Sequence, residues 1–437
     1  MNHRSAALAA ALSLAFAANA QTPAAAPPTA TTTVLKAAHL FDGRSGNLSS
    51  PGLVVVQGTK IIAVGASAAI PADARVIDLG DATLVPGYID AHTHIAYDHD
   101  DDWAQGFYEG MLRFPVEQSF HAGRNAKVTL QAGVTSAREV GAGDFVDVAL
   151  RNAINAGLTE GPRLLVAGHS LGSTGGHCDS SPFPPERVTP SGPLQGVCNG
   201  PEECRLATRL QMKYGADVIK ICASGGVLSE SDPVDVPQLT PDELAAIVSE
   251  AHNWNRKVAA HSHGDVAAKQ AVEAGVDSIE HGSFLITATL QLMKQKGVYL
   301  VPTRLALVWT VGHADTYPPK IGAKARAAGA SHDAMFKNAL KIGVPIAFGT
   351  DAAVSPHGIN AQEFGDMVDL GMTPSAALLS SSQGSAKLLG IDGETGTLEA
   401  GKFADIVAVP GDVLRDIRAT EKPVLVMKQG VVISVKD

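Results

Sequence analysis

Short apolar runs alternate with longer amphipathic segments through most of the chain. The runs predict strands near residues 84–90, 134–138, 164–167, 218–221, 258–260, 278–280, 298–301 and 346–348. Strands that alternate with helices are typical of an α/β fold with a parallel sheet, and eight of them are what a closed barrel requires. The pattern therefore predicts a (β/α)8 TIM barrel over residues 86–394.

The sequence clearly marks the start of one helix between these strands. Thr240 is suited to cap a helix that continues to residue 255, with Pro241 in its first turn. Asp242 and Glu243 follow, at the end where the helix dipole favours negative charge. The helix leads directly into the expected strand that ends at His261.

Two longer insertions, residues 168–200 and 304–330, interrupt the alternation. Both follow expected strands, so they should overhang the barrel mouth, where long loops commonly form the substrate pocket. Apolar residues of the second insertion can line such a pocket: Leu305, Leu307, Val308, Trp309 and Tyr317. The same residues can instead pack the loop or bury a contact between copies, and we expect a homo-oligomer.

The two ends of the chain have other patterns. Residues 33–85 and 395–437 alternate apolar and polar positions between turns, which predicts small β-sheets. Residues 1–20 combine a basic start, an apolar run too short to span a bilayer comfortably, and small residues before Gln21. We interpret them as a secretory signal peptide, with an uncleaved anchor as the alternative, and residues 21–32 as a flexible leader. The mature protein is expected to be periplasmic or secreted.

Composition and charge narrow the range of partners. The chain has 437 residues, 45% of them hydrophobic, which is enough to bury a large core in one barrel with a smaller satellite domain. Its formal net charge of -10 argues against nucleic acid or an anionic membrane as a partner. We therefore expect a small-molecule substrate, and no membrane association once the signal peptide is removed.

Export changes the interpretation of the four cysteines. Cys178, Cys198 and Cys204 lie in or beside a stretch rich in Pro and Gly, where an oxidising compartment allows one disulfide. The most plausible pair is Cys178 with Cys198. Cys222 follows the expected strand at 218–221 and is predicted to be buried and free.

Residues able to bind metal stand at the ends of the expected strands. They are His92, His94, Lys220, His261, His281 and Asp351. In a parallel barrel the carboxyl ends of the strands converge on one mouth, so these residues become neighbours. His92 and His94 lie two residues apart on one strand and therefore point to the same side. A lone histidine is more often an ordinary polar group, but this joint set predicts a metal centre.

The motifs around these residues resemble the amidohydrolase superfamily. They are PGYIDAHTH, AGVTSAREVG, STGGHCD, GADVIKICASGG, AHSHG, SIEHGS, FGTDA and GTLEAGKFADIVAV, and they extend over nearly the whole mature chain. Within the superfamily the chain is similar to prolidases and metallocarboxypeptidases, and to bacterial amidohydrolases that cleave ochratoxin A. The resemblance implies hydrolysis of an amide or peptide bond to a C-terminal amino acid. It also implies that residues 33–85 and 395–437 join in one discontinuous β-sandwich beside the barrel.

The resemblance further implies a role for each strand-end residue. In binuclear members a carboxylated lysine of the fourth strand bridges two divalent metal ions, and Lys220 takes that place here. The other ligands would be His92, His94 and Asp351 for one ion, and His261 and His281 for the second. Zinc is the default metal for a histidine-rich site. Such a pair would activate a bridging hydroxide and polarise the scissile carbonyl, with Asp351 as general base and later general acid.

Four further residues are expected to contact the substrate: His177, His263, Arg138 and Arg304. Either arginine can form a bidentate pair with a free carboxylate on the substrate. For Arg138, an internal ion pair with a neighbouring acid is equally open. His263 lies two residues beyond His261, so it can share that face or be an ordinary loop residue.

Two other functions compete with this interpretation. A mono-metal deaminase or cyclic-amide hydrolase of the same superfamily would usually lack the bridging lysine and often carry an acid three residues after the fifth-strand histidine. Here that position is Gly264, and Lys220 is present. A non-catalytic binding protein that has lost its metals is hard to reconcile with six filled ligand positions. A metal count of two, one or none per chain separates the three.

Overall fold

The computed structural model describes residues 32–179, 184, 186–230 and 232–435. The expected signal peptide and all but the last residue of the expected leader lie outside the described residues, and the first strand begins at Thr32. Among the described residues, no helix is long and apolar enough to cross a bilayer.

Parallel strands lie at the centre of the molecule and form two sheets. One sheet has the order β10 (Arg163–Val166), β9 (Val134–Glu139), β8 (Tyr88–Thr93), and the other β11 (Val218–Cys222), β12 (Lys257–Ser262), β13 (Ser278–His281), β14 (Tyr299–Val301). All neighbours within these sheets run parallel. The expected strands between residues 134 and 301 are therefore confirmed, while the run at 84–90 is divided at Gly87 between β8 and a strand of another sheet, β7 (Ala82–Pro86).

The last expected strand, residues 346–348, is not a strand in the structure. Ile346 makes only an isolated parallel bridge with Leu300. The segment nevertheless lies between β14 and β8, because the Leu300 carbonyl accepts from Ala347 and the Phe348 carbonyl accepts from Ala91. Pro345 has no N–H to extend the ladder, which explains why the hydrogen bonds are made without a regular strand.

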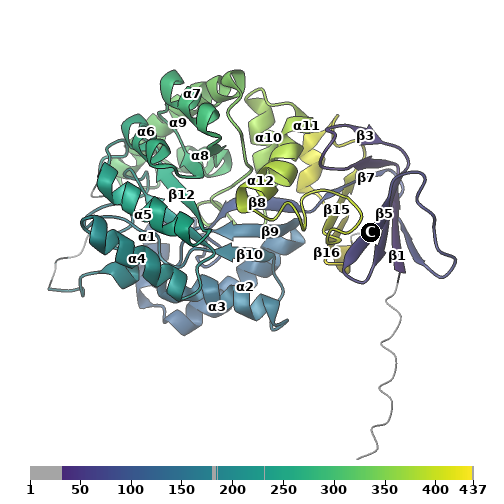
Figure 1. The fold of residues 1–437 in the computed structure, drawn as a ribbon, viewed down its shortest axis with the longest axis horizontal. Coiled ribbons are helices and arrows are strands. Elements are labelled where there is room, and N and C mark those ends of the chain that lie inside the picture. The colour runs from purple at the N-terminus through teal and green to yellow at the C-terminus, as the bar shows by residue number, and fades with distance from the viewer. Residues whose placement is uncertain (1–31, 180–183, 185, 231, 436–437) are drawn as a thin grey trace, which may run out of the picture.

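Helices surround these strands, as Figure 1 shows for α2 to α7. They are α1 (Trp103–Leu112), α2 (Pro115–Gln131), α3 (Val146–Asn155), α4 (Pro201–Lys213), α5 (Pro241–Asn253), α6 (Asp265–Ala274), α7 (Thr287–Lys296), α8 (Arg304–Gly312), α9 (Pro319–Ile342), α10 (Gln362–Asp369), α11 (Pro374–Leu379) and α12 (Ser385–Leu389). The predicted start of α5 is confirmed, since the Thr240 hydroxyl accepts from the Glu243 N–H while the Glu243 carboxylate accepts from the Thr240 N–H. The insertion at 304–330 is mostly helical, in α8 and the start of α9.

Two further sheets combine both ends of the chain. One has the order β5 (Lys60–Val64), β4 (Gly52–Gln57), β1 (Thr32–Ala37), β6 (Arg75–Asp78), and the other β17 (Val431–Val435), β16 (Leu425–Lys428), β15 (Ile406–Pro410), β7, β2 (His39–Phe41), β3 (Leu48–Ser49). β15 pairs antiparallel with β7, so the terminal segments lie side by side at the right of Figure 1. One apolar cluster contains residues of both sheets, among them Leu35, Val54, Leu84, Ile406 and Met427.

Both disulfides of the structure differ from the predicted pairing. Cys178 is bonded to Cys222, and Cys198 is bonded to Cys204. The prediction was wrong because residues 168–179 lie against the end of β11, where Leu171 bridges to Ile221 and Cys178 lies beside Cys222. Cys222 is therefore not free.

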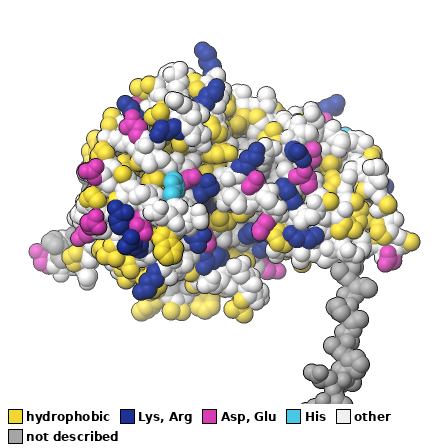
Figure 2. Space-filling view, in the orientation of Figure 1, with side chains coloured by type: hydrophobic (Ala, Val, Ile, Leu, Met, Phe, Trp, Pro, Cys, Tyr) yellow, Lys and Arg dark blue, Asp and Glu magenta, His cyan; other side chains and the backbone are white. Residues whose placement is uncertain are grey.

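The visible surface carries charges of both signs. In Figure 2, Lys and Arg side chains are interspersed with Asp and Glu side chains and do not gather in a single-sign area on this face.

Candidate metal centre

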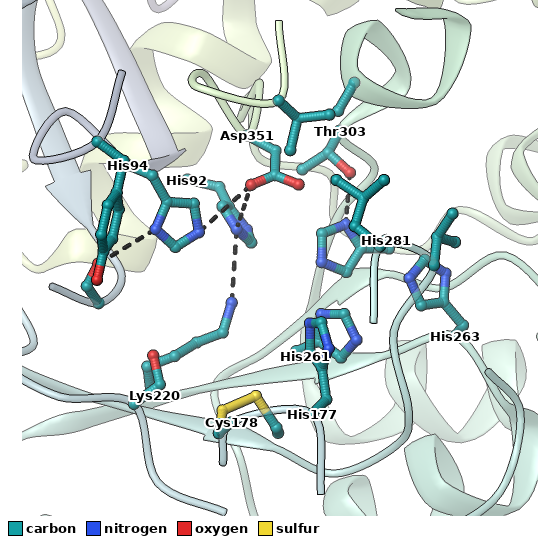
Figure 3. Close-up of a pocket in the computed structure, with 18 of the residues that line it drawn as sticks. His92, His94, His177, Cys178, Lys220, His261, His263, His281, Thr303 and Asp351 are labelled. Atoms are coloured by element: carbon teal, nitrogen blue, oxygen red, sulfur yellow. Dashed lines mark hydrogen bonds and ion pairs between the residues drawn. A yellow bond between two sulfur atoms is a disulfide. The ribbon is translucent and has the colours of Figure 1, made fainter. Parts of the chain in front are cut away.

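The six strand-end residues converge on one cavity of about 480 Å³. His92 belongs to β8, Lys220 to β11, His261 to β12 and His281 to β13, while His94 follows the end of β8 and Asp351 follows the segment at 346–348. Figure 3 shows these side chains directed toward one another. The structure thus places together residues that lie up to 259 positions apart, from His92 to Asp351 (351 minus 92).

The Nε2 atoms of His92 and His94 both face Asp351. The Nδ1–H of His92 donates to Glu280 Oε2 at 2.8 Å, and the Nδ1–H of His94 donates to the Gly141 carbonyl at 3.2 Å. Since Nδ1 is engaged in this way, Nε2 is the atom of each ring that can ligate a metal. Asp351 Oδ1 lies 3.3 Å from the first Nε2 and 3.4 Å from the second. Two ring nitrogens and a carboxylate oxygen thus converge, which is an arrangement that suits a cation.

His261 and His281 are held in a similar manner on the opposite side. The Nε2–H of His261 donates to the Gly225 carbonyl at 3.1 Å, and the Nδ1–H of His281 donates to Thr303 Oγ1 at 2.7 Å. Thr303 gives its own hydroxyl proton to the Pro302 carbonyl, so it acts as an acceptor for His281. The other nitrogen of each ring is left as a lone pair.

His263 joins this second group. Its ring stacks on that of His281 at a centroid distance of 4.8 Å. The ligand atoms of His261, His263 and His281 lie within 4.8 Å of one another, and the same holds for His92, His281 and Asp351. His281 belongs to both groups and connects them.

The protonation of these rings suits metal binding. Burial lowers the pKa of His94 to about 4 and holds the pKa values of His261 and His281 well below the usual histidine range. The imidazoles are therefore neutral near pH 7. Histidines that ligate metals commonly donate their other N–H to a carboxylate, a carbonyl or a hydroxyl, and all four do so here. The donor set fits divalent cations such as zinc.

Lys220 lies between the two groups. Its Nζ is 3.5 Å from His92 Nε2, and the side chain is buried. Burial lowers the pKa of this amine to about 8, although Glu280 and Asp351 act in the opposite direction. The neutral amine, which is the form that can add carbon dioxide, is thus more accessible than in an exposed lysine.

Arg138 does not contact the cavity, and its interpretation as a substrate ligand was wrong. Its guanidinium donates to Glu280 Oε1 at 2.8 Å and to the Ala91 carbonyl at 2.5 Å, and the residue is 1% exposed. The long side chain reaches the protein interior, where an unpaired carboxylate would be costly. The internal ion pair, the alternative left open by the sequence, is what the structure contains.

Glu280 is the residue that sequence reasoning missed. It accepts from His92 with one oxygen and from Arg138 with the other. Burial raises its pKa, but the charge of Arg138 and the hydrogen bond from His92 outweigh burial and bring the pKa to about 2. The signal was available in SIEH, because an acid within an apolar strand requires a partner.

Three residues around the centre have left-handed backbone conformations: His281 with φ of 69°, Thr303 with φ of 47° and Asp351 with φ of 59°. Such values are uncommon for residues other than glycine and persist only where surrounding contacts impose them. They occur here at two ligand candidates and at the hydrogen-bond partner of one.

His177 enters the cavity from the overhanging segment. Its ring stacks on that of His261 at a centroid distance of 4.4 Å, and its Nδ1 lies 3.2 Å from Ser229 Oγ. The neighbouring disulfide between Cys178 and Cys222 ties this segment to the end of β11, as Figure 3 shows beside Lys220. A covalent link therefore fixes His177 over the second histidine group.

Arg304, the other predicted carboxylate ligand, is also outside the cavity lining. Its Nη1 pairs with Asp333 Oδ1 at 2.8 Å, since the N-terminus of α8 directs the side chain toward α9. Of the apolar residues expected in this segment, Leu307 lines the cavity, whereas Leu305 is buried beside it and Val308 is 42% exposed. Lining residues that the sequence did not indicate include Tyr97, Asp144, His169, Thr303 and His332.

Comparisons with known proteins agree with this geometry. The model of the amidohydrolase family matches residues 83–433. The ochratoxinase of Aspergillus niger is 35% identical over 413 residues, which cover 90% of this chain and 84% of that protein.

Solved structures give the same result. The crystal structure of a Xaa-Pro dipeptidase with bound methionine in the active site has a TM-score of 0.87 and 37% identity, covering 92% of this chain and 99% of that chain. The crystal structure of A. niger ochratoxinase has a TM-score of 0.82 and 31% identity, covering 93% and 96%. With a family match across most of its length and a histidine-rich centre at its strand ends, this chain belongs to the amidohydrolase family.

Proposed function

We propose that this amidohydrolase cleaves an amide or peptide bond to a C-terminal amino acid, with dipeptides, N-acyl amino acids and ochratoxin A as the substrates to test. The observation that carries the proposal is the convergence of several histidine ring nitrogens with Asp351 in one cavity. The substrate class is supported by the similar dipeptidase and ochratoxinase.

Two divalent metal ions, with zinc as the first candidate, fit the donors of this cavity. The first ion would be held by His92, His94 and Asp351, and the second by His261 and His281. Lys220 would bridge them once its amine is carboxylated. When bound, such ions polarise a scissile carbonyl and acidify water. More donors line the cavity than one ion needs, and Lys220 lies among them, which favours this arrangement over a mono-metal deaminase.

Asp351 is the proposed proton carrier. Its Oδ1 faces the imidazole nitrogens of His92 and His94, which leaves Oδ2 to accept a proton from the attacking water. The same oxygen can then return the proton to the nitrogen of the leaving amine. Burial raises the pKa of Asp351, but the two histidines and Lys220 outweigh it and keep the pKa below its usual range. The Asp351 side chain is therefore ionised and can accept a proton.

The cavity walls suggest how a substrate would be oriented. Val227, Leu228, Ala306 and Leu307 form an apolar side that suits an apolar or aromatic side chain of the released amino acid. Since neither Arg138 nor Arg304 lines the cavity, the free carboxylate would be bound by imidazole and hydroxyl donors. His177 and His263 remain the proposed contacts.

The fold is proposed to be a single TIM barrel over residues 86–394 with a β-sandwich of residues 33–85 and 395–437. Parallel bridges from Leu171 to Ile221 and from Thr93 to Ala352 support the joining of the two parallel sheets into one barrel. The apolar cluster common to the two terminal sheets supports the sandwich.

The function is tested by measuring metal content and amine release together. Metal analysis of the purified mature chain should give two equivalents of metal, and chelation should abolish the release of phenylalanine or proline from N-acyl and dipeptide substrates. Methyl-esterifying or amidating the substrate carboxylate should lower kcat/KM by about tenfold to a hundredfold, since one charge-assisted contact is lost.

One metal per chain with deamination of a cyclic substrate would contradict the proposal. No metal and no turnover would point to a binding protein.

We also propose export to the periplasm or medium, on the basis of residues 1–20. N-terminal sequencing of the protein made in a Gram-negative host should find a mature start near Gln21. A product that begins at Met1 would contradict export by cleavage.

A further inference from the structure

His177 is held at two points by the loop that connects β11 to α5. Its backbone N–H donates to Gln238 Oε1 at 2.8 Å, and its ring Nδ1 lies 3.2 Å from Ser229 Oγ. The ring then lies beside that of His261, as Figure 3 shows. The loop after β11 thus fixes both the backbone and the ring of a residue that belongs to another loop of the cavity.

Asp232 connects these two contacts. Its Oδ2 accepts from Gln238 Nε2 at 2.8 Å and from the Gly226 N–H at 3.1 Å, and its Oδ1 accepts from the Ser229 hydroxyl. The residue is 4% exposed. Burial raises the pKa of Asp232, but the hydrogen bonds from Ser229 and Gln238 outweigh burial and keep the pKa below its usual range. The side chain is therefore an ionised acceptor within the loop.

The charge of Asp232 determines how its two neighbours face His177. A carboxylate can only accept, so it holds the NH2 group of Gln238 toward itself and leaves the amide oxygen for the backbone of His177. In the same way it takes the hydroxyl proton of Ser229 and leaves an oxygen lone pair toward the ring Nδ1. With Nδ1 engaged, Nε2 is the ring atom of His177 that can contact a substrate.

Packing restricts the His177 ring to the same place. A Cβ at Gly226 would overlap three atoms of the ring, so glycine is the residue that leaves room for it. Any other residue at position 226 would displace the ring or the loop. The close approach of loop and ring and the hydrogen bonds of Asp232 therefore specify one arrangement.

Lys324 of α9 fixes the loop itself. Its Nζ donates to the backbone carbonyls of Gly226, Ser229 and Asp232. The first two carbonyls flank residues 227–228, which belong to the apolar side of the cavity. Nζ also lies 3.9 Å from Asp232 Oδ1, where opposite charges attract. The segment that orients His177 is thus anchored to a helix as well as to its own strand.

We propose that Asp232 is a positioning residue for substrate binding, which holds His177 beside the second histidine group without touching the reacting atoms. The inference rests on the proposed function, in which His177 contacts the carboxylate of the leaving amino acid. That carboxylate is remote from the bond that breaks. Such a contact is equally strong in the bound substrate and the transition state, so it sets KM rather than kcat.

The kinetic test compares Asp232→Asn with Asp235→Asn in the metal-loaded mature chain. Asp235 is an exposed residue of the same loop, so both variants lose one negative charge at neighbouring positions. The amide of Asp232→Asn brings an N–H group toward side chains that already donate. We expect KM to rise by about tenfold while kcat changes by less than about threefold. Asp235→Asn should keep the original KM, and both variants should keep the original metal content.

A cycle of single and double substitutions with His177→Ala separates positioning from general destabilisation. In the His177→Ala background, Asp232→Asn should raise KM by less than about twofold more, because the residue that it positions is gone. An equal increase in both backgrounds would overturn the proposal. So would an unchanged KM or a loss of bound metal in Asp232→Asn.

Crystal structures of the variants give a readout that does not depend on the proposed function. Gly226→Ala is included because it displaces the ring without changing any charge. In Asp232→Asn and Gly226→Ala, the His177 ring should leave its stacked position on His261, whereas in Asp235→Asn it should remain there. A ring that stays in place in Asp232→Asn overturns the positioning role. A displaced ring, in a protein whose original chain hydrolyses no amide substrate, supports the positioning role and overturns the proposed function alone.

Discussion

The two groups of candidate ligands in the cavity differ in their electrostatic support. His92 faces Asp351 on one side and donates to Glu280 on the other, so the first group has two carboxylates. His261 and His281 donate to a carbonyl and a hydroxyl, and no carboxylate belongs to the histidine cluster that they form with His263. The first group can compensate the charge of a cation by itself. The second group would need the negative charge that a carboxylated Lys220 would supply.

This difference implies an order of metal affinity. A carboxylate ligand and a carboxylate behind a histidine both raise the affinity of a site for a dication. Neutral imidazoles alone leave two neighbouring dications poorly compensated. We therefore expect the first group to retain its ion longer than the second, and the following variants test the contrast from the largest effect to the smallest.

Lys220→Ala should have the largest effect, because it would remove the proposed anionic bridge on which the second group would depend. We expect complete loss of activity and a fall in bound metal from two equivalents to one or fewer, measured by metal analysis. Bicarbonate with short carboxylic acids should restore part of both. Full activity without additives would contradict the carboxylated bridge.

Asp351→Asn should lower kcat by about a hundredfold or more, since general base catalysis typically contributes 10²–10⁴. The amide keeps the shape and an oxygen, so substrate should still bind with a similar KM. Steady-state kinetics and a metal count on the same sample separate loss of the proton carrier from loss of a ligand. Near-normal turnover would place the base elsewhere.

Glu280→Gln should weaken metal binding at the first group of ligands by about tenfold to a hundredfold, because the side chain that accepts from His92 loses its negative charge. The control is Arg138→Met, which breaks the same buried ion pair but leaves the carboxylate on His92. Each variant should lose stability, by about 3–5 kcal/mol for removal of one partner of such a pair. Competition with a chelator should reveal an affinity change in Glu280→Gln that exceeds that of the control.

Thr303→Val should have the smallest effect, since it removes only a neutral acceptor of the His281 proton. We expect a loss of affinity at the second group near the lower end of the tenfold to hundredfold range of such partners. Thr310→Val is the control, because Thr310 lines the same cavity but donates to the Leu307 carbonyl on its own helix. Equal effects of the two variants would show that Thr303 acts through packing.

The strand-end residues were predictable because each follows an apolar run, and parallel strands end on the same side of their sheet. His92 and His261 could be placed at the cavity without knowing a single distance. The positions of the two arginine side chains could not be predicted in this way, because a long and flexible side chain can turn from a strand end into the interior or along a helix. Arg138 and Arg304 each turn to an acid that is distant in sequence, Glu280 and Asp333.

The cysteines illustrate the same limit for covalent structure. Cys198 and Cys204 are separated by only 6 residues, yet Cys178 bonds across 44 residues to Cys222. Pairing depends on where a long loop returns, and the loop composition carries no information on that return. The segment at 346–348 shows the converse, because it takes the expected place in space without forming the regular strand that its apolar pattern predicts.

The sequence by itself determined the family, the alternation of strands and helices, and the strand-end ligand candidates of the cavity, because periodicity and strand direction are local properties that translate directly into position. Only the tertiary structure decided which ring nitrogens contact which neighbours, that Glu280 lies behind His92, and which cysteines pair. These properties depend on neighbours brought from distant parts of the sequence, and the free energy of a buried proton, charge or apolar face is set by those neighbours.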